Sequence, residues 1–361
     1  MTSIGNFDYS GGFRFASSTV KHYSGKYPAE YVLTPGDLLL VMTCQTEGGE
    51  ILGVPGLVPD DGRIYLHNQR IGRVEIDRPD LACSAYLFQL ARWSEFNRQL
   101  VETATGSKIL HTSPTRIEST QFALPSLVEQ EAIAEVLGAL DDKIAANTRT
   151  VATADKLAAA HTRSSLSHDS AALVEIADII MGSSPPGASY NEHGEGTLFH
   201  QGIRDFGVRT PKNRMWTTAP ARIAAAGDTL LSVRAPVGQT NIAAETTCIG
   251  RGIASVRSKA ETPWTLFHTL RDDPEVWAPY EAEGTVFGSI NRAQLAALRV
   301  PLAPSDVREP LEERLAALES LIASTLAEND TLEATRDALL PALMSGKLRV
   351  RDAEPIVEEV M

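Results

Sequence analysis

The sequence has few of the features that mark secreted, membrane or metal-binding proteins. Only three cysteines occur in 361 residues, Cys44, Cys83 and Cys248, and no two of them form a Cys-x-x-Cys pair. This spacing argues against a zinc ribbon or a disulfide scaffold and predicts a reducing, cytoplasmic location. No apolar run approaches the ~20 residues that span a bilayer, and the first residues lack the pattern of a signal peptide. We therefore expect no membrane association.

Catalytic motifs are also missing. The sequence has no G-x-x-x-x-G-K-[ST] phosphate loop, no G-x-G-x-x-G after a strand and no H-E-x-x-H. His193-Gly194-Glu195 matches half of a zinc deaminase motif, but the P-C-x-x-C half is absent. We expect no catalytic residue, no metal site and no cofactor in this chain.

The charge is unevenly distributed along a chain long enough for two or three domains. The 33 basic and 46 acidic residues give a net charge of −13, which argues against a polyanionic partner. Residues 301–361 hold six basic and thirteen acidic side chains, so this segment supplies −7 of the total. Residues 200–260, in contrast, hold nine basic and three acidic side chains. Such a basic island can bind a polyanion, or it can be a solvated surface.

Two stretches have the alternating four-three spacing of a helix with one apolar seam. Their seam positions correspond at an offset of 178 residues: Ile133, Leu137, Leu140 and Ile144 in the first, and Leu311, Leu315, Leu318 and Ile322 in the second. A single long helix with one apolar seam is unstable in water. We therefore expect the two helices to pair with each other, and antiparallel pairing to set one globular module at either end.

Shorter matches indicate that the rest of the chain is duplicated too. Gly36-Asp37 resembles Gly227-Asp228 at an offset of 191, Ile71-Gly72-Arg73 resembles Ile249-Gly250-Arg251 at 178, and Gly106-Ser107 resembles Gly288-Ser289 at 182. Gly-Asp before an apolar run is typical of a turn that leads into a buried strand. The predicted fold class is α+β, with two mixed α/β modules separated by two long helices in an antiparallel coiled coil.

Four segments carry a resemblance to the specificity subunits of type I restriction–modification systems. Two belong to the helices, Leu124–Gln130 with Leu140–Ile144 and Leu339–Leu348. The other two, Gly227–Gly238 and Gly182–Gly187, resemble parts of that family's target-recognition domains. The resemblance implies recognition domains at 1–124 and 169–303, conserved helices at 125–168 and 304–348, and an acidic tail at 349–361. The resemblance also implies that the first recognition domain is shortened at its N-terminus. The segment before Gly36 has fewer residues than the corresponding segment of the second domain, between Ser170 and Gly227.

The resemblance also implies a function and a set of partners. Each recognition domain would bind one half of a bipartite, asymmetric sequence in double-stranded DNA. The paired helices would fix the gap between the half-sites and dock two modification (methyltransferase) subunits, and restriction (translocase and nuclease) subunits would join the complex. S-adenosylmethionine, ATP and Mg would be bound by those partners, so that the chain itself would be non-catalytic.

Candidate DNA contacts are long polar side chains near the predicted turns. Arg suits guanine edges, either cation suits phosphate, and Asn or Gln suits adenine. In the second module Arg234 ranks first, followed by Arg204, Arg209, Lys212, Arg214 and Arg251; in the first module the candidates are Asn68, Gln69, Arg70 and Arg73. Weaker candidates in the first module are Thr43, Gln45 and Thr46, which lie in the loop equivalent to the one after Arg234. For each arginine the alternative is a solvated or internally paired side chain, and for Gln69 it is a cap at a strand end.

Two other functions stay open at the level of sequence. The chain could be a structural coiled-coil adaptor whose modules bind no DNA. It could also serve a modification-only system or a fused methyltransferase–nuclease. A DNA-binding protein should gather its arginines on one surface, whereas an adaptor would scatter them.

Overall fold

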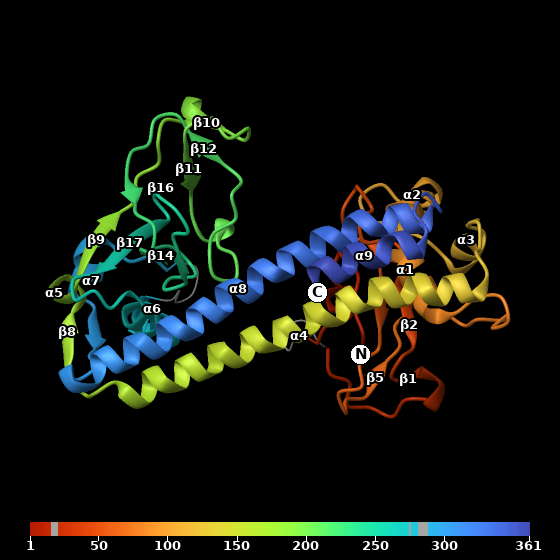
Figure 1. Cartoon of the computed structure of the whole chain (residues 1–361), viewed down its shortest axis with the longest axis horizontal. Coiled ribbons are helices and arrows are strands. Elements are labelled where there is room, and N and C mark those ends of the chain that lie inside the picture. The colour runs from red at the N-terminus through yellow and green to blue at the C-terminus, as the bar shows by residue number, and fades with distance from the viewer. Residues whose placement is uncertain (16–20, 274–275, 281–287) are drawn as a thin grey trace. The chain divides into compact units, whose positions relative to one another are not determined.

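The chain folds into two compact units. The computed structural model describes residues 1–15, 21–273, 276–280 and 288–361 (Figure 1). Unit 1 comprises Met1–Ala146 and Glu328–Met361, and unit 2 comprises Asn147–Ala327. Two long helices, α4 (Leu127–Ser165) and α8 (Ser305–Met344), each contribute one part to both units. The predicted fold class, two mixed α/β modules with two long helices, is confirmed.

Local sequence signals set the ends of the long helices. Before α4, the Ser126 hydroxyl accepts a hydrogen bond from the Glu129 backbone N–H at 3.4 Å, which satisfies one free donor of the first turn. After α8, Gly346 has a φ of 69°, a left-handed conformation that glycine adopts without a steric penalty. The helix therefore ends where the sequence places its glycine cap.

In unit 1 the two helices pack antiparallel along the predicted seam, since residues early in α4 meet residues late in α8. One buried cluster contains Ile133, Leu137 and Leu140 of α4 with Leu332, Leu339 and Leu343 of α8, and Ile144 packs beside it, partly buried. Helix α9 (Val350–Val360) joins this cluster through Ala353 and Val357. The segment predicted as an acidic tail thus forms a helix with one buried face.

In unit 2 the other parts of the same helices pack by the same rule. Leu311 and Leu315 of α8 are buried with Ala158 of α4, and Ile322 is buried with Val151 and Ala154. Leu318 is partly buried against both clusters. The seam residues of both helices therefore lie in helix–helix contacts, as the four-three spacing predicts.

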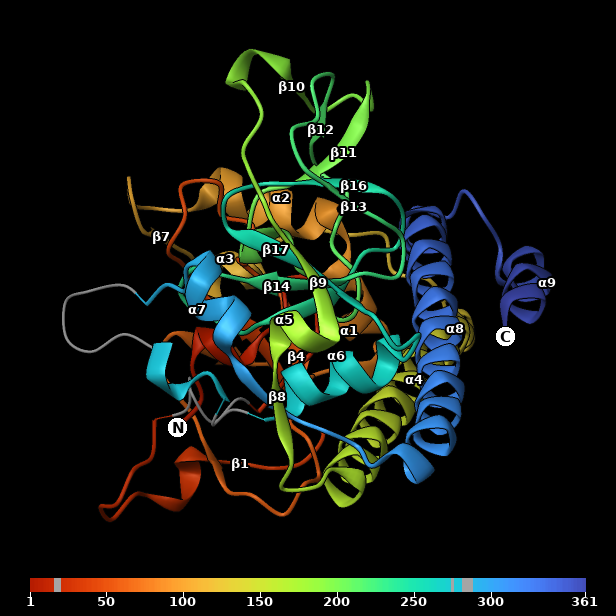
Figure 2. The same ribbon diagram turned by 90° about the vertical axis from the view of Figure 1, so that its left-hand side faces the viewer.

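The globular part of unit 2 contains two main sheets. The first is antiparallel in the order β15 (Thr240–Ile242), β14 (Thr229–Ser232), β17 (Ile253–Ser258) and β9 (Ala177–Met181). Figure 2 shows β9, β17 and β14 side by side in this sheet. Helix α6 (Pro263–Asp272) packs on it, and the core between them includes Leu231, Ala254 and Leu270.

Smaller elements complete unit 2. The second sheet has the order β10 (Tyr190–Asn191), β12 (Trp216–Thr217), β11 (Thr197–His200), β16 (Thr247–Ile249) and β13 (Ile223–Ala224). The remaining elements are β8 (Ser170–Ala172), paired with β18 (Arg299–Pro301), the short helices α5 (Leu173–Ile176) and α7 (Arg292–Ala297), and the 3-10 turns η3 (Gly187–Ser189), η4 (Ile203–Asp205) and η6 (Ala278–Tyr280).

Unit 1 repeats the central part of this arrangement. Its main sheet is antiparallel in the order β4 (Pro55–Leu57), β2 (Leu38–Val41) and β6 (Ile71–Arg73). Among the described residues no strand borders β6 as β9 borders β17. The other elements are β1 (Val32–Leu33) with β5 (Tyr65–Leu66), β3 (Thr43–Cys44) with β7 (Leu110–His111), the helices α1 (Ser84–Arg92), α2 (Ser94–Thr103) and α3 (Pro114–Glu118), and the turns η1 (Ile4–Asn6) and η2 (Ala29–Tyr31).

The Gly-Asp motif forms the same turn in both units. Gly36 and Gly227 have φ angles of 88° and 83°, a conformation that favours glycine. The next residue, Asp37 or Asp228, accepts a hydrogen bond at 2.9 Å from a backbone N–H three residues earlier. Both turns lead into the central strand of the sheet, which confirms the correspondence at an offset of 191.

Strand register corrects a second predicted match. Val41 of β2 pairs with Ile71, and its counterpart Ser232 of β14 pairs with Ile253. Each of these isoleucines also donates its N–H to the carbonyl three residues earlier, at 2.9 Å and 3.0 Å. Ile71 therefore corresponds to Ile253, and the predicted match with Ile249 is wrong by four residues. By this register Gln69 corresponds to Arg251.

The third short match is wrong for the same reason. Thr43 pairs with His111, and the equivalent residue Arg234 forms a bridge with Ser289. His111 thus corresponds to Ser289 at an offset of 178, so that the predicted correspondence of Ser107 with Ser289 fails. The offset of 178 residues that relates the two long helices therefore also relates His111 to Ser289.

Candidate nucleic-acid interface

Arg234 of unit 2 lies just beyond the central strand β14. The backbone around it is fixed on both sides: Ile290 donates its N–H to the Val233 carbonyl at 3.1 Å, and Ala235 donates to the Gly288 carbonyl at 2.9 Å. The Arg234 side chain itself is exposed. Among the described residues, none forms an ion pair with its guanidinium. These two backbone hydrogen bonds hold the position of an exposed cation that has no ion-pair partner among the described residues.

Arg251 lies in the turn that leads into β17. Its side chain is exposed, and the Ser184 hydroxyl accepts from both its backbone N–H at 3.4 Å and its Nε–H at 3.3 Å. Ser184 therefore steadies the Nε side of the guanidinium. No described residue forms an ion pair with the two terminal amino groups.

Three of the predicted DNA contacts come together in unit 2. Two adjoining open cavities of about 600 and 330 Å³ share Arg234, Ala235 and Arg251 in their walls, and Arg204 of η4 lines the smaller one. The walls also include polar residues that the sequence analysis missed, namely Ser184, Gln201, Ser289, Asn291 and Gln294. Ser184 and Ser289 lie in segments that the sequence analysis singled out for other reasons, and no pattern in the sequence marks any of the five as a contact, because the fold brings them together from distant parts of the chain.

Two other predicted residues lie outside these cavities. Arg214 is exposed but forms an ion pair with the buried carboxylate of Asp205. Lys212 is exposed, and its backbone N–H donates to the Asp205 carbonyl at 2.7 Å. The structure thus leaves the Lys212 side chain as a surface cation and gives Arg214 an internal partner.

Arg209 is a correction to the predicted set of DNA contacts. Its side chain is only 6% exposed and forms ion pairs with Asp155 of α4 and Glu319 of α8, the latter at 2.9 Å from Nε. Burial by itself would raise the pKa of Asp155, but a hydrogen bond from Arg271 and the charge of Arg209 outweigh it and lower that pKa. Arg209 therefore ties the globular part of unit 2 to its helices and is not available to DNA.

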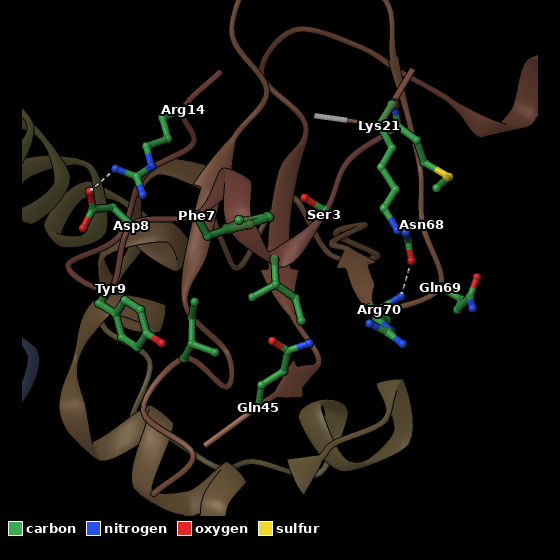
Figure 3. A pocket seen from close by; sticks show the side chains of 14 residues that line it. Ser3, Phe7, Asp8, Tyr9, Arg14, Lys21, Gln45, Asn68, Gln69 and Arg70 are labelled. Carbon is green, nitrogen blue, oxygen red and sulfur yellow. Dashed lines mark hydrogen bonds and ion pairs between the residues drawn. The ribbon is translucent and has the colours of Figure 1, made fainter. Parts of the chain in front are cut away.

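In unit 1 three of the predicted residues line one cavity of about 620 Å³. Asn68, Gln69 and Arg70 lie together on one side of it (Figure 3), in the turn that precedes β6. The Asn68 side chain accepts from the Arg70 backbone N–H at 3.0 Å, which holds the turn. Gln69 and Arg70 are exposed, and the structure describes no hydrogen bond of the Gln69 amide.

The other wall of this cavity comes from the start of the chain, which the sequence analysis did not single out. Asp8, Tyr9 and Arg14 lie across from the turn (Figure 3). The segment is held in place by Phe7, which is buried and packs edge-to-face on Phe13 at 5.5 Å between ring centroids. Lys21 also lines the cavity, as does Gln45, a weaker candidate of the sequence analysis. The packing of the two phenylalanines holds the first segment, and with it Asp8, Tyr9 and Arg14, at the site.

Arg73 does not line this cavity. It lies at the end of β6 and forms an ion pair with Glu75. The structure therefore does not place Arg73 with the other candidates in this cavity.

Across the described ranges, no three His, Cys, Asp or Glu side chains gather so as to hold a metal ion. No helix in the described part of the chain is both long and apolar enough to cross a membrane.

Comparisons with known proteins agree with this architecture. No protein-family model matches the chain. A curated protein of Methanocaldococcus jannaschii, provisionally named the type I restriction enzyme MjaX specificity subunit, is 27% identical over 350 residues, which cover 90% of this chain and 81% of the relative.

Solved structures give two further matches. The S subunit of the type I restriction–modification system of M. genitalium has 13% identity and a TM-score of 0.61, with 95% of this chain and 91% of that chain covered. The HsdS subunit of Thermoanaerobacter tengcongensis has 25% identity and a TM-score of 0.40, with 96% and 90% covered. The M. genitalium structure shares the fold, and the M. jannaschii relative shares sequence along most of both chains. The chain is thus similar in sequence to a type I restriction enzyme specificity subunit and shares its fold with the S subunit of a type I restriction–modification system.

Proposed function

We propose that this chain is the DNA-recognition subunit of a type I restriction–modification complex, and that each unit binds one half of a bipartite, asymmetric target. One observation carries the proposal. The same turn precedes the equivalent strands β6 in unit 1 and β17 in unit 2, and it lies at a cavity in each unit. Each cavity is lined by exposed Arg and by Gln or Asn side chains. Side chains of these types bind phosphates and base edges.

The paired helices have a separate role in this proposal. Each of α4 and α8 is continuous through parts of both units, so their length fixes how many helical turns join one recognition unit to the other. We assign them the setting of the gap between the half-sites and the docking of two methyltransferase subunits. S-adenosylmethionine, ATP and Mg belong to those partners and to the restriction subunits, and this chain contributes no catalytic group.

Methylome sequencing tests the proposal directly. A host that carries the chain with its modification subunits should show N6-methyladenine in one bipartite motif, and deletion of the chain should abolish that motif. Exchange of residues 170–300 with those of another specificity subunit should change one half-site only. If both half-sites changed, or if the motif survived the deletion, the proposal would be wrong.

The spacing role needs its own experiment. A seven-residue insertion of two helical turns, made in both α4 and α8, should keep the apolar seam in register and lengthen the gap between the half-sites. The half-site sequences should stay the same. A gap of unchanged length in a folded variant would refute the assignment.

A further inference from the structure

The duplicated fold places two different side chains at one equivalent position. Strand register makes Gln69 of unit 1 the counterpart of Arg251 of unit 2. Both follow the first residue of a turn that is closed by a hydrogen bond across it, from Ile71 to Asn68 and from Ile253 to Gly250. Both side chains are exposed, and both line the cavity of their own unit. The two units thus share this position, but one places a neutral amide there and the other a positively charged guanidinium.

The equivalent positions Thr43 and Arg234 do not both carry an exposed side chain. Arg234 is exposed, but its counterpart Thr43 is buried, and the Thr43 hydroxyl lies 3.1 Å from Nδ1 of His111. The position of Gln69 and Arg251 therefore offers a long polar side chain in both units, whereas the position of Thr43 and Arg234 does so in unit 2 alone.

The pair of residue types limits what this position can recognise. Either side chain can donate a hydrogen bond to a phosphate, but only the arginine adds the positive charge from which phosphate binding draws most of its affinity. What the two side chains share is a bidentate contact to the major-groove edge of a purine: glutamine with N6 and N7 of adenine, arginine with O6 and N7 of guanine. A common position that holds Gln in one unit and Arg in the other thus fits the reading of a purine.

The surroundings of Arg251 fit such a contact. The Ser184 hydroxyl accepts from its Nε–H, on the side away from the terminal amino groups. A guanidinium held in this way presents a fixed fork, and little side-chain entropy is lost when it pairs with a base. We propose that Gln69 and Arg251 are the equivalent specificity-determining residues of the two units, so that the half-site of unit 1 has an adenine where the half-site of unit 2 has a guanine. This inference rests on the proposed function, since it assumes that both units bind DNA.

Reciprocal substitution tests the inference in the assembled complex of the full-length chain with its modification subunits. Methylated motifs are read from DNA of cells that express each variant. Arg251→Gln should change one guanine of the unit 2 half-site to adenine and leave the other half unchanged. Gln69→Arg should make the opposite change in the unit 1 half-site. Preference between the two bases should shift by about 5- to 150-fold, the range of one good bidentate contact.

Two control variants separate base reading from other roles. Arg251→Lys keeps the positive charge but loses the fork, so it should relax the preference for guanine at the same base pair. Arg78→Gln removes an exposed arginine that lies outside α4, α8 and the cavities, and it should leave the motif unchanged.

Each result decides between the inference and its rivals. If Arg251→Gln weakens methylation of every sequence equally while Arg251→Lys restores it, Arg251 binds phosphate and the inference is overturned. An unaltered motif in folded Arg251→Gln and Gln69→Arg variants also overturns it. If the wild-type complex methylates no bipartite motif, the proposed function itself fails, which is a different outcome from a bipartite motif that ignores these substitutions.

Discussion

The imidazole of His268 lies 2.9 Å from the carboxylate of Glu319, measured from Nε2 to Oε1, and both side chains are buried. The contact joins α6 to α8 within unit 2. In unit 1 the Gln89 amide of α1 donates to Asp141 of α4 at 3.2 Å, and Asp141 precedes Glu319 by the helix offset of 178 residues. In each copy a carboxylate at the equivalent position of the long helix therefore joins that helix to the preceding globular part, through Gln89 in unit 1 and His268 in unit 2. Because histidine can gain or lose a proton, the contact in unit 2 depends on pH. Glutamine does not titrate, so its side chain adds no such dependence in unit 1.

The first prediction concerns the pH dependence of stability in unit 2. Burial disfavours the charged ring, but hydrogen bonds to Asp272 and Glu319 outweigh it and raise the pKa of His268 above its ordinary 6.5. The charged ring then stabilises the fold fully below that ordinary value, and the stabilisation is lost as the pH rises through the raised pKa. Melting temperature should therefore fall over this range.

His268→Gln isolates this contribution, because it installs the residue that unit 1 has at the equivalent position. The difference in melting temperature between wild type and His268→Gln should shrink as the pH rises above the ordinary histidine value. His193→Gln is the matched control, since His193 is exposed. A difference that stays constant from pH 5 to 9 would contradict a charged, stabilising His268.

The second prediction follows from the burial of Arg209. Arg209→Ala leaves Glu319 and Asp155 without a cation that pairs with both, and removal of one partner of a buried ion pair costs about 3–5 kcal/mol. Denaturant unfolding of the full chain should register this loss. Arg204→Ala, in an exposed side chain of the same segment, should change the free energy of unfolding by less than about 0.5 kcal/mol. Equal effects of the two variants would return Arg209 to the candidate DNA contacts.

The third prediction uses two leucines of one helix. Leu315 is fully buried in the seam of α8, whereas Leu321 is 45% exposed. Leu315→Ala should lower the free energy of unfolding by about 2–5 kcal/mol, because it leaves a cavity between packed helices. Leu321→Ala makes the same change in the same helix outside the seam, and its smaller effect in denaturant titrations serves as the reference. A loss at Leu321 as large as the loss at Leu315 would show that the seam does not hold the helices.

The sequence predicts well those features that depend on local periodicity. The seam from Ile133 to Ile144 repeats every three or four residues, and a glycine with positive φ must precede Asp37 and Asp228, so both patterns are visible without a structure. The three-residue match of Ile71 with Ile249 was wrong because a short identity between two copies takes no account of insertions. The hydrogen-bonded register of the strands identifies Ile253 as the equivalent residue.

Side-chain roles were harder to predict because they depend on partners from distant segments. Arg204 and Arg209 lie five residues apart in one basic window, yet the first lines an open cavity and the second is buried between carboxylates. Nothing in the local sequence distinguishes them. In unit 1, likewise, Arg14 reaches the cavity only because Phe7 and Phe13 anchor the first segment in the core.

The last prediction concerns Arg234, the exposed arginine beyond β14. If it contacts DNA as proposed, Arg234→Ala should weaken binding of the assembled complex to its specific duplex by about 1–3 kcal/mol, and should weaken binding to unrelated duplex much less. Titrations at several salt concentrations separate the two contributions, because a lost phosphate contact reduces the salt dependence by about one unit of slope while a lost base contact does not. Arg78→Ala, outside α4, α8 and the cavities, provides the control for removal of one exposed positive charge. An unchanged affinity for the specific duplex at moderate salt would exclude Arg234 from the interface and leave Arg204 and Arg251 as the arginines that line the cavities.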